Sequence, residues 1–319
     1  VTDLEVSAGG RVVRTYAGEE VAARLEPLGS RGATATLGPS VAATFFVAVS
    51  FASRDEIPPR LEHRLTVTAA PFPGPLAQTG CAMPIDRDAP APVMGSPLAP
   101  GERYVAADSC CEARRHTRAP IVVDGRVYFA QRYAVDWEQV DAERRFVNGD
   151  PSDPAAYTIY GAEIVAAADG EVIHVVDGLP DQVPGELPSG VSFEQADGNS
   201  IVIEHGDGPY ALYAPLAPGS PAVAVGDRVA RGDRLGRGGN SGNSSAPHLH
   251  FHLMDGPSPL ASNGVPYVIE AFEVTGTYAS TELLEATENT TDPLPIDPVG
   301  GPSARAAAIP LDRSIVTLR

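Results

Sequence analysis

Glycine and proline interrupt this chain so often that it has little room for long helices. The 319 residues include 32 Gly and 31 Pro, and the runs between them are short. Proline is excluded from helix interiors and central strands, whereas alternation of apolar and polar residues is typical of strands with one buried face. Runs such as "ATFFVAVSF", "GEVIHVVDG" and "HLHFHLMDG" have this strand-like composition. The sequence therefore predicts an all-β protein.

The same patterns divide the chain into four segments. Short alternating runs over 1–75 predict an antiparallel β-sandwich, and the proline-dense stretch over 76–110 predicts a linker. Residues 111–275 contain further strands and predict a second β-domain. The acidic segment 276–319 reads as a loop-like tail, and its last run, "AAIPLDRSIVTLR", is expected to form a strand that could return to the N-terminal domain.

The charge balance excludes some partners. With 41 acidic and 23 basic residues the net charge is −18, which repels nucleic acid and anionic lipid surfaces. No apolar run approaches the roughly 18 residues that a membrane-spanning helix needs, so membrane insertion is not expected. The sequence starts at Val1 without a leader, as expected for a mature exported protein, and we expect a secreted, periplasmic or cell-surface location.

Three cysteines are present: Cys81, Cys110 and Cys111. Their odd number forbids complete internal pairing, and their spacing does not match a zinc ribbon or finger. A bridge from Cys81 to one of the adjacent pair would suit an oxidising compartment. A free thiol or a bridge between the two neighbours is the alternative.

The run "APHLHFHL" over 246–253 places three histidines at every second position. On a strand, His248, His250 and His252 share one face, while leucine and phenylalanine fill the other. Imidazole is the commonest zinc ligand and the side chain best suited to proton transfer near neutral pH. This face of the strand therefore predicts metal binding or acid–base chemistry.

This run, together with "GDRVARGDRLGRGGNSGNSS" before it, resembles the signature of the lysostaphin-type zinc endopeptidases, also called the duplicated-hybrid-motif family. "YGAEIVAAADGEVIHVVDG" and "YALYAPL" resemble two further blocks of that family, so the resemblance extends over about 128–268. It implies a small, mostly antiparallel β-domain with a groove across its sheet. It also implies zinc as cofactor and cleavage of peptide cross-links in peptidoglycan.

The resemblance assigns roles to individual residues. His250 matches the ligand of the family's HxH motif, His248 the catalytic histidine, and Asp136 the ligand aspartate of its HxxxD motif. Arg132 stands where that motif has its histidine, and a guanidinium has no lone pair to offer zinc. Pro215 replaces a second active-site histidine and cannot transfer a proton or donate to an oxyanion.

His116 is the candidate replacement for the missing ligand. "RAPIVVDGRVYFAQRYAVDW" predicts a hairpin around Asp124-Gly125, and His116 is placed on the extension of its first strand. A strict two-residue turn pairs His116 with Tyr133, on the wrong face. A three-residue loop with a glycine bulge pairs it with Arg132, on the face of Asp136. The ligand set His116, Asp136 and His250 depends on the second register.

Two further residues are candidates for supporting roles. His252 could orient a ligand from the second coordination sphere or bind the metal itself. Tyr213, beside the altered position 215, could stabilise an oxyanion through its hydroxyl group, although tyrosines in strands usually serve packing.

Three functions follow as alternatives. The first is a secreted zinc metallopeptidase acting on peptidoglycan or other peptides, with activity weakened by the loss at position 215. The second is an inactive module that binds cell walls or regulates another hydrolase. The third is an extracellular structural protein that self-assembles.

Overall fold

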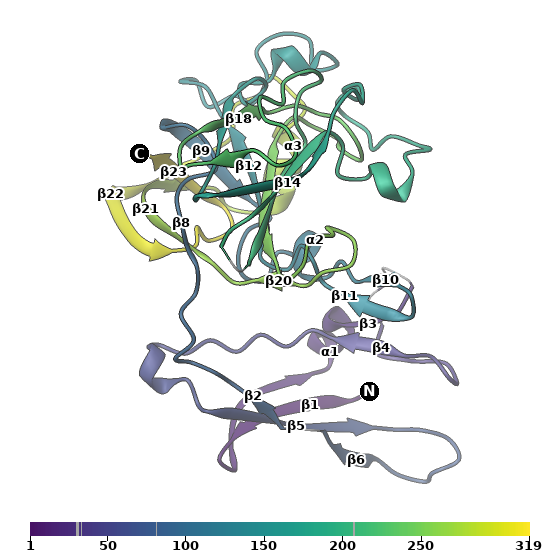
Figure 1. Ribbon diagram of the computed structural model, residues 1–319. Coiled ribbons are helices and arrows are strands. Elements are labelled where there is room, and N and C mark those ends of the chain that lie inside the picture. Colours follow the sequence, from purple (N-terminus) through teal and green to yellow (C-terminus); the bar gives the residue numbers. More distant parts are fainter. Residues whose placement is uncertain (30–31, 33, 81, 207) are drawn as a thin grey trace. The chain divides into compact units, whose positions relative to one another are not determined.

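The protein consists of two compact units, Val1–Pro90 and Ala91–Arg319 (Figure 1). The computed structural model describes residues 1–319 except 30–31, 33, 81 and 207. Both units are built mainly from strands, as the sequence predicts. No helix among the described residues is long and apolar enough to cross a membrane.

The first unit contains a five-stranded antiparallel sheet and a separate strand pair. The sheet has the order β2-β1-β5-β6, with β7 also beside β5. Its strands are β1 (Asp3–Ala8), β2 (Arg11–Ala17), β5 (Arg60–Val67), β6 (Leu76–Thr79) and β7 (Met83–Pro84). The other elements are α1 (Glu19–Arg24), β3 (Leu25–Pro27), β4 (Ala43–Phe45) and η1 (Arg54–Glu56).

Side chains from both sheets form the core of this unit. Val6 and Tyr16 are fully buried, and the ring of Phe45 in β4 meets that of Tyr16 edge-on at 5.5 Å between centroids. Ring contacts of this kind stabilise a core beyond the burial of their area. The packing of β4 on the larger sheet agrees with the predicted sandwich.

The second unit is organised around a twelve-stranded sheet. Ten strands follow the order β17-β14-β15-β16-β19-β12-β9-β23-β21-β22, with β20 beside β19 and β8 beside β21. They are β8 (Val93–Met94), β9 (Gly101–Ala107), β12 (Val135–Gln139), β14 (Gly170–Val176), β15 (Ser200–Glu204), β16 (Tyr210–Ala214), β17 (Arg228–Val229), β19 (Leu249–Met254), β20 (Gly264–Val265), β21 (Val268–Thr277), β22 (Asp297–Ala308) and β23 (Ser314–Leu318). All neighbours in it are antiparallel except β8 and β21.

Shorter elements surround this sheet. They are α2 (Arg114–Thr117), β10 (Ile121–Val123), β11 (Arg126–Tyr128), η2 (Pro154–Ala156), β13 (Glu163–Val165), η3 (Phe193–Gln195), β18 (Arg234–Arg237) and α3 (Thr281–Thr287).

The two faces of the sheet have different roles. On β12 and β19, Val135, Trp137, Leu249 and Phe251 point into the main hydrophobic core and are fully buried. The alternate residues, including Asp136 and His250, therefore lie on the opposite face. A second core covers part of that opposite face and includes Val105, Tyr157, Leu284 and Leu294. The polar residues of β12 and β19 lie next to this second core.

Two predicted boundaries are wrong. The proposed linker 76–110 contains β6, β7, β8 and β9, and β9 is a central strand of the large sheet. The final strand β23 does not return to the N-terminal domain, because it pairs with β9 and β21 inside the second unit. Its Ile315 and Val316 are buried there, and this burial holds the chain's end in the sheet.

Candidate metal centre

The site begins with two strands that are neighbours in space and far apart in sequence. β12 and β19 are antiparallel, and their register sets Asp136 directly opposite His250. Directly opposite residues on one face bring their side chains together. His250 Nδ1 accordingly lies 2.7 Å from Asp136 Oδ1.

The third member, His116, comes from outside the sheet. It lies on α2, a single helical turn after β9, and is buried. Its Nε2 is 3.2 Å from Asp136 Oδ2, and its Nδ1 is 2.7 Å from the carbonyl oxygen of Asp108. Since a carbonyl oxygen only accepts, Nδ1 carries a proton, and Nε2, which faces the Asp136 carboxylate, is the nitrogen that a metal would take once its proton is released.

The route by which His116 was expected to reach Asp136 is wrong. The hairpin β10–β11 has the strict two-residue turn, with Ile121 paired to Tyr128 and Val123 to Arg126. His116 is not part of that hairpin, so its register does not decide where the imidazole points. The helical turn and the bond to Asp108 place the side chain instead.

The three side chains fit a metal ion. The ligand atoms of His116, Asp136 and His250 all lie within 4.8 Å of one another. Ligands about 2.0 Å from a tetrahedral zinc are roughly 3.3 Å apart, so small side-chain movements would close the group around an ion. Two imidazole nitrogens and one carboxylate oxygen are a donor set that zinc accepts, and they leave a further position open.

His252 supports His250 from behind. His250 Nε2 lies 2.8 Å from His252 Nδ1, and the two rings meet at a steep angle. His250 Nδ1 donates to the ionised carboxylate of Asp136, and a metal binding at Nδ1 would displace that proton and leave Nε2–H to donate to His252. Each candidate histidine ligand thus has its other nitrogen held by a second group, as metal-binding histidines usually do. His252 Nε2 is buried and has no hydrogen-bond partner among the described residues.

Charge is concentrated at Asp136. Burial opposes its ionisation, but the neighbouring His116, His248 and His250 outweigh burial and hold its pKa well below the usual range. Burial alone would lower the pKa of His116, yet Asp136 and Asp108 raise it to about 9. For His250 burial dominates and the pKa is lowered. The carboxylate is therefore ionised and available to a cation at neutral pH.

His248 is the most accessible of the histidines at the site. Its side chain is 20% exposed, and its Nδ1 lies 2.8 Å from the carbonyl oxygen of Ala246. Nδ1 is therefore the protonated nitrogen, and Nε2, which is 3.8 Å from Asp136 Oδ1, carries the lone pair. A base with its lone pair toward the site and partial access to solvent is suited to proton transfer.

Tyr213 does not line the site, so its predicted role as oxyanion donor is wrong. The residue pairs with Phe251 and points to the core face, where it is fully buried. Its hydroxyl oxygen accepts a hydrogen bond from the backbone N–H of Ala167 at 2.9 Å. The register between β16 and β19 places it on the face opposite to His250, and the sequence alone does not give that register.

The structure also shows where Arg132 and Pro215, which replace the two expected histidines, lie. Arg132 lies exposed in a turn before β12, with its guanidinium carbon 5.7 Å from the centre of the Tyr133 ring. Pro215 directly follows Ala214, which pairs with His250, so position 215 lies at the end of the strand beside the site. Neither side chain can bind a metal or carry a proton.

Sequence reasoning missed two contributors. The backbone carbonyl of Asp108 fixes His116, and no sequence pattern signals such a contact. Glu138 follows Asp136 by two residues, shares its face of β12 and is buried. Burial, followed by the nearby Glu288, raises its pKa well above the usual value. The alternation that identified the histidines could have found Glu138.

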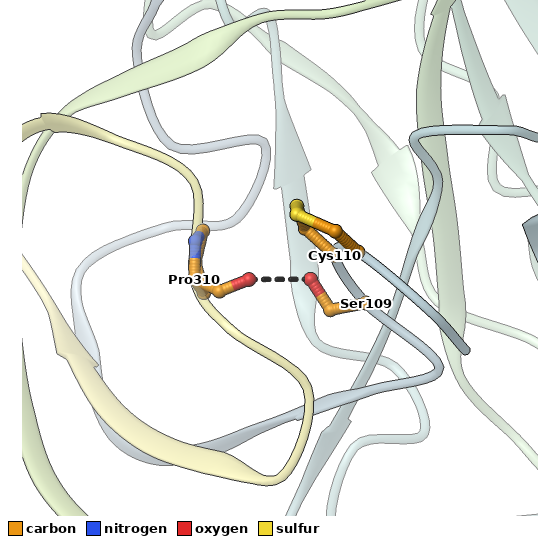
Figure 2. The surroundings of a disulfide bond; sticks show 4 residues. Ser109, Cys110 and Pro310 are labelled. Carbon is orange, nitrogen blue, oxygen red and sulfur yellow. Dashed lines mark hydrogen bonds between the residues drawn. A yellow bond between two sulfur atoms is a disulfide. The ribbon is translucent and has the colours of Figure 1, made fainter. Parts of the chain in front are cut away.

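A disulfide lies in the segment before His116. It joins the adjacent Cys110 and Cys111 (Figure 2), which is the alternative that the sequence left open. The expected bridge to Cys81 is therefore not formed by either of them. Cys81 itself lies outside the described residues.

The comparisons with known proteins point to one family. Residues 155–262 match the sequence profile of Peptidase family M23. The matched stretch contains His248, His250, His252 and Pro215, whereas His116 and Asp136 precede it. No curated protein sequence matches the chain.

Several solved structures show modest similarity to the chain. The catalytic domain of the antimicrobial peptidase lysostaphin from Staphylococcus simulans is 21% identical, with 52% of this chain and 88% of that chain covered and a TM-score of 0.28. Pseudoalterin, an M23 metalloprotease from the deep sea, is 15% identical, with 68% and 97% covered and a TM-score of 0.33. A mutant catalytic domain of the M23 protein EnpA from Enterococcus faecalis is 19% identical, with 55% and 92% covered and a TM-score of 0.29.

Two imidazoles and a carboxylate directed toward one point are a donor set found in catalytic metal sites. The profile match makes this assignment more specific. Residues 155–262 form a lysostaphin-type M23 peptidase domain. It is a divergent version, because the resemblance places a histidine where this domain has Pro215, and another where Arg132 lies before the matched stretch.

Proposed function

We propose that this protein is a zinc metallo-endopeptidase that cleaves peptidoglycan or other peptides at a reduced rate. The observation that carries the proposal is the group formed by His116, Asp136 and His250, whose ligand atoms lie within 4.8 Å of one another. The site retains the donors that the family's chemistry needs, with His116 in place of the ligand lost at position 132. A groove that only bound peptides would not need imidazoles that point to one place and whose second ring nitrogen is held by a hydrogen bond.

Each residue has a role in this proposal. His116, Asp136 and His250 hold the metal, and His252 and the carbonyl of Asp108 fix the two imidazoles. Zinc, when bound, acts as a Lewis acid toward a peptide carbonyl and toward water. His248 takes up a proton on Nε2 and returns it to the leaving amine, while the Ala246 carbonyl keeps the ring oriented.

The reduced rate follows from Pro215. Removing one donor that stabilises developing negative charge costs about 10²- to 10³-fold in turnover. The other candidate donor, Tyr213, is buried in the core and does not compensate. We therefore expect slow hydrolysis.

The substrate and the location are also proposals. The M23 domain supports peptides as the substrate class, and the resemblance described above implies peptidoglycan cross-links. A disulfide between Cys110 and Cys111 suits an oxidising compartment. We infer a secreted, periplasmic or cell-surface protein.

The test has two readouts. Metal analysis of the purified full chain should give close to one zinc per chain, and His250→Ala should remove it. Purified cell walls and cross-bridge peptides should then be cleaved slowly, in a manner that stops with His250→Ala. Protein without zinc after reconstitution would contradict the proposal.

A second candidate is a module that binds cell-wall peptides without cleaving them. Pro215 favours it, because the residue removes a group that can transfer protons from the edge of the site. Stoichiometric zinc and binding to cell walls, with no cleavage by the wild type and none by a Pro215→His variant, would select this candidate.

A further inference from the structure

The chain between β14 and β15 exposes three large apolar side chains beside the segment that carries His248. Val183, Leu187 and Phe193 are 67%, 64% and 50% exposed. We propose that this loop, residues 179–199, binds the substrate peptide and selects a bulky apolar residue with a basic residue next to it. This inference rests on the proposed function, because it names the substrate class of the same site.

Both limbs of the loop are fixed to the turn that precedes β19. In the first limb, the backbone N–H of Gly185 donates at 2.8 Å to the carbonyl of Ser245, which lies three residues before His248. In the second limb, the carbonyl of Ala196 accepts from the backbone N–H of Asn243 at 2.9 Å. The loop therefore has a base that holds its apolar side chains beside this turn without burying them.

The first limb is also linked to His248 through side chains. The buried Asn240 donates from its side-chain amide to the carbonyl of Gln182 at 2.9 Å. Ser244 Oγ donates to Asn240 Oδ1 at 2.7 Å and lies 3.4 Å from His248 Nδ1. Two side chains thus link Gln182, and Val183 after it, to His248. Since an extended peptide advances about 3.3 Å per residue, a residue about two or three places from the bond beside His248 reaches this loop.

The surface of the loop favours one kind of peptide. A bound peptide that covers Val183 and Leu187 with an apolar side chain removes their surface from water, which is favourable. Glu186 beside them is exposed, and the sequence has no lysine or arginine between Arg145 and Arg228. The loop therefore attracts a basic side chain and repels an acidic one. A peptide of glycine alone gains from neither property.

Binding of three peptides to the zinc-loaded full chain tests the inference. The His248→Ala background prevents cleavage during the measurement. The peptides are glycine chains with a fluorophore at one end, and their two central residues are Leu-Arg, Leu-Glu or Gly-Gly. Fluorescence anisotropy should give the Leu-Arg peptide a Kd about 10-fold lower than that of the Gly-Gly peptide. The Leu-Glu peptide should bind less tightly than the Leu-Arg peptide, because the carboxylates of the loop repel it.

The Val183→Ser/Leu187→Ser variant removes two of the apolar side chains. It should raise the Kd of the Leu-Arg peptide about 10-fold and leave that of the Gly-Gly peptide unchanged. The matched control is Val225→Ser, because Val225 is a valine of similar exposure, 62%, before the edge strand β17. Three strands separate β17 from β19, so this variant should keep the preference. The zinc content of each preparation checks that the metal site is intact.

Three results would overturn the inference while leaving the metal site intact. They are equal Kd values for the three peptides, tighter binding of the Leu-Glu peptide, and a preference that the Val183→Ser/Leu187→Ser variant retains. Wild-type protein that binds no zinc would instead overturn the proposed function. The same titration would still decide which peptide the loop selects, because binding requires no turnover.

Discussion

His250 and Asp136 are 114 residues apart in sequence, yet His250 Nδ1 lies 2.7 Å from Asp136 Oδ1 across two neighbouring strands. The strand register that sets this pair also directs both side chains away from the main core and toward His116. The sheet therefore supplies a rigid half of the candidate metal site. The other half, His116, depends on a single helical turn.

His116→Ala should weaken zinc binding at least 100-fold, because only Asp136 and His250 remain as ligands. Chelator competition on the purified protein measures the change. The matched control is His174→Ala, which removes an exposed histidine from β14 and should leave the affinity unchanged. Equal zinc affinity in wild type and His116→Ala would exclude His116 as a ligand.

His252→Leu should lower zinc affinity by about 10- to 100-fold, because His250 loses the acceptor that fixes its ring. His252→Asn should retain more of the affinity, since its amide oxygen can occupy the place of Nδ1. If both variants bind zinc as tightly as the wild type, the contact between the rings of His250 and His252 serves packing alone.

His248→Ala should separate catalysis from metal binding. We expect turnover of peptide substrates to fall by about 10²- to 10⁴-fold, as for the loss of a general acid–base group, with the zinc content unchanged. Steady-state kinetics and metal analysis on one preparation give both values. Loss of zinc together with activity would make His248 a fourth ligand.

Phe251→Ala should act on stability. The side chain is fully buried and its ring meets those of Tyr213 and Tyr267 at 5.1 and 5.4 Å. Truncation of such a ring lowers the free energy of unfolding by about 3–5 kcal/mol. Denaturant unfolding of metal-free protein provides the measurement. His250→Ala changes the opposite face of the same strand and should lower the free energy of unfolding of the metal-free protein much less.

Asp197→Asn should stabilise the protein at high pH. Burial raises the pKa of Asp197 from 3.8 to about 6, so between these pH values the native state holds a proton that the unfolded state releases. The free energy of unfolding therefore falls as pH rises through this window, and the full cost is present above it. Asparagine does not ionise.

Denaturant unfolding at pH 8 should give Asp197→Asn about 3 kcal/mol more stability than the wild type, and the difference should shrink toward zero at pH 4. Glu186→Gln, which changes an exposed carboxylate, is the control and should show no such trend. A constant difference across this pH range would contradict a raised pKa for Asp197.

The sequence by itself determined the strand-rich fold and the face shared by His248, His250 and His252. Both follow from the period of two along a strand, which is a local property of the backbone. Asp136 was assigned from the HxxxD motif of the resembling family, and the face of Tyr213 depends on the register between β16 and β19, which the period alone does not give.

The tertiary structure alone decided how His116 reaches Asp136. The hairpin register does not matter, because α2 and the carbonyl of Asp108 place the imidazole. It also decided that β23 joins β9 and β21. Such contacts between distant segments depend on which surfaces bury the most apolar area together, and that is a property of the packed chain and not of any short stretch of it.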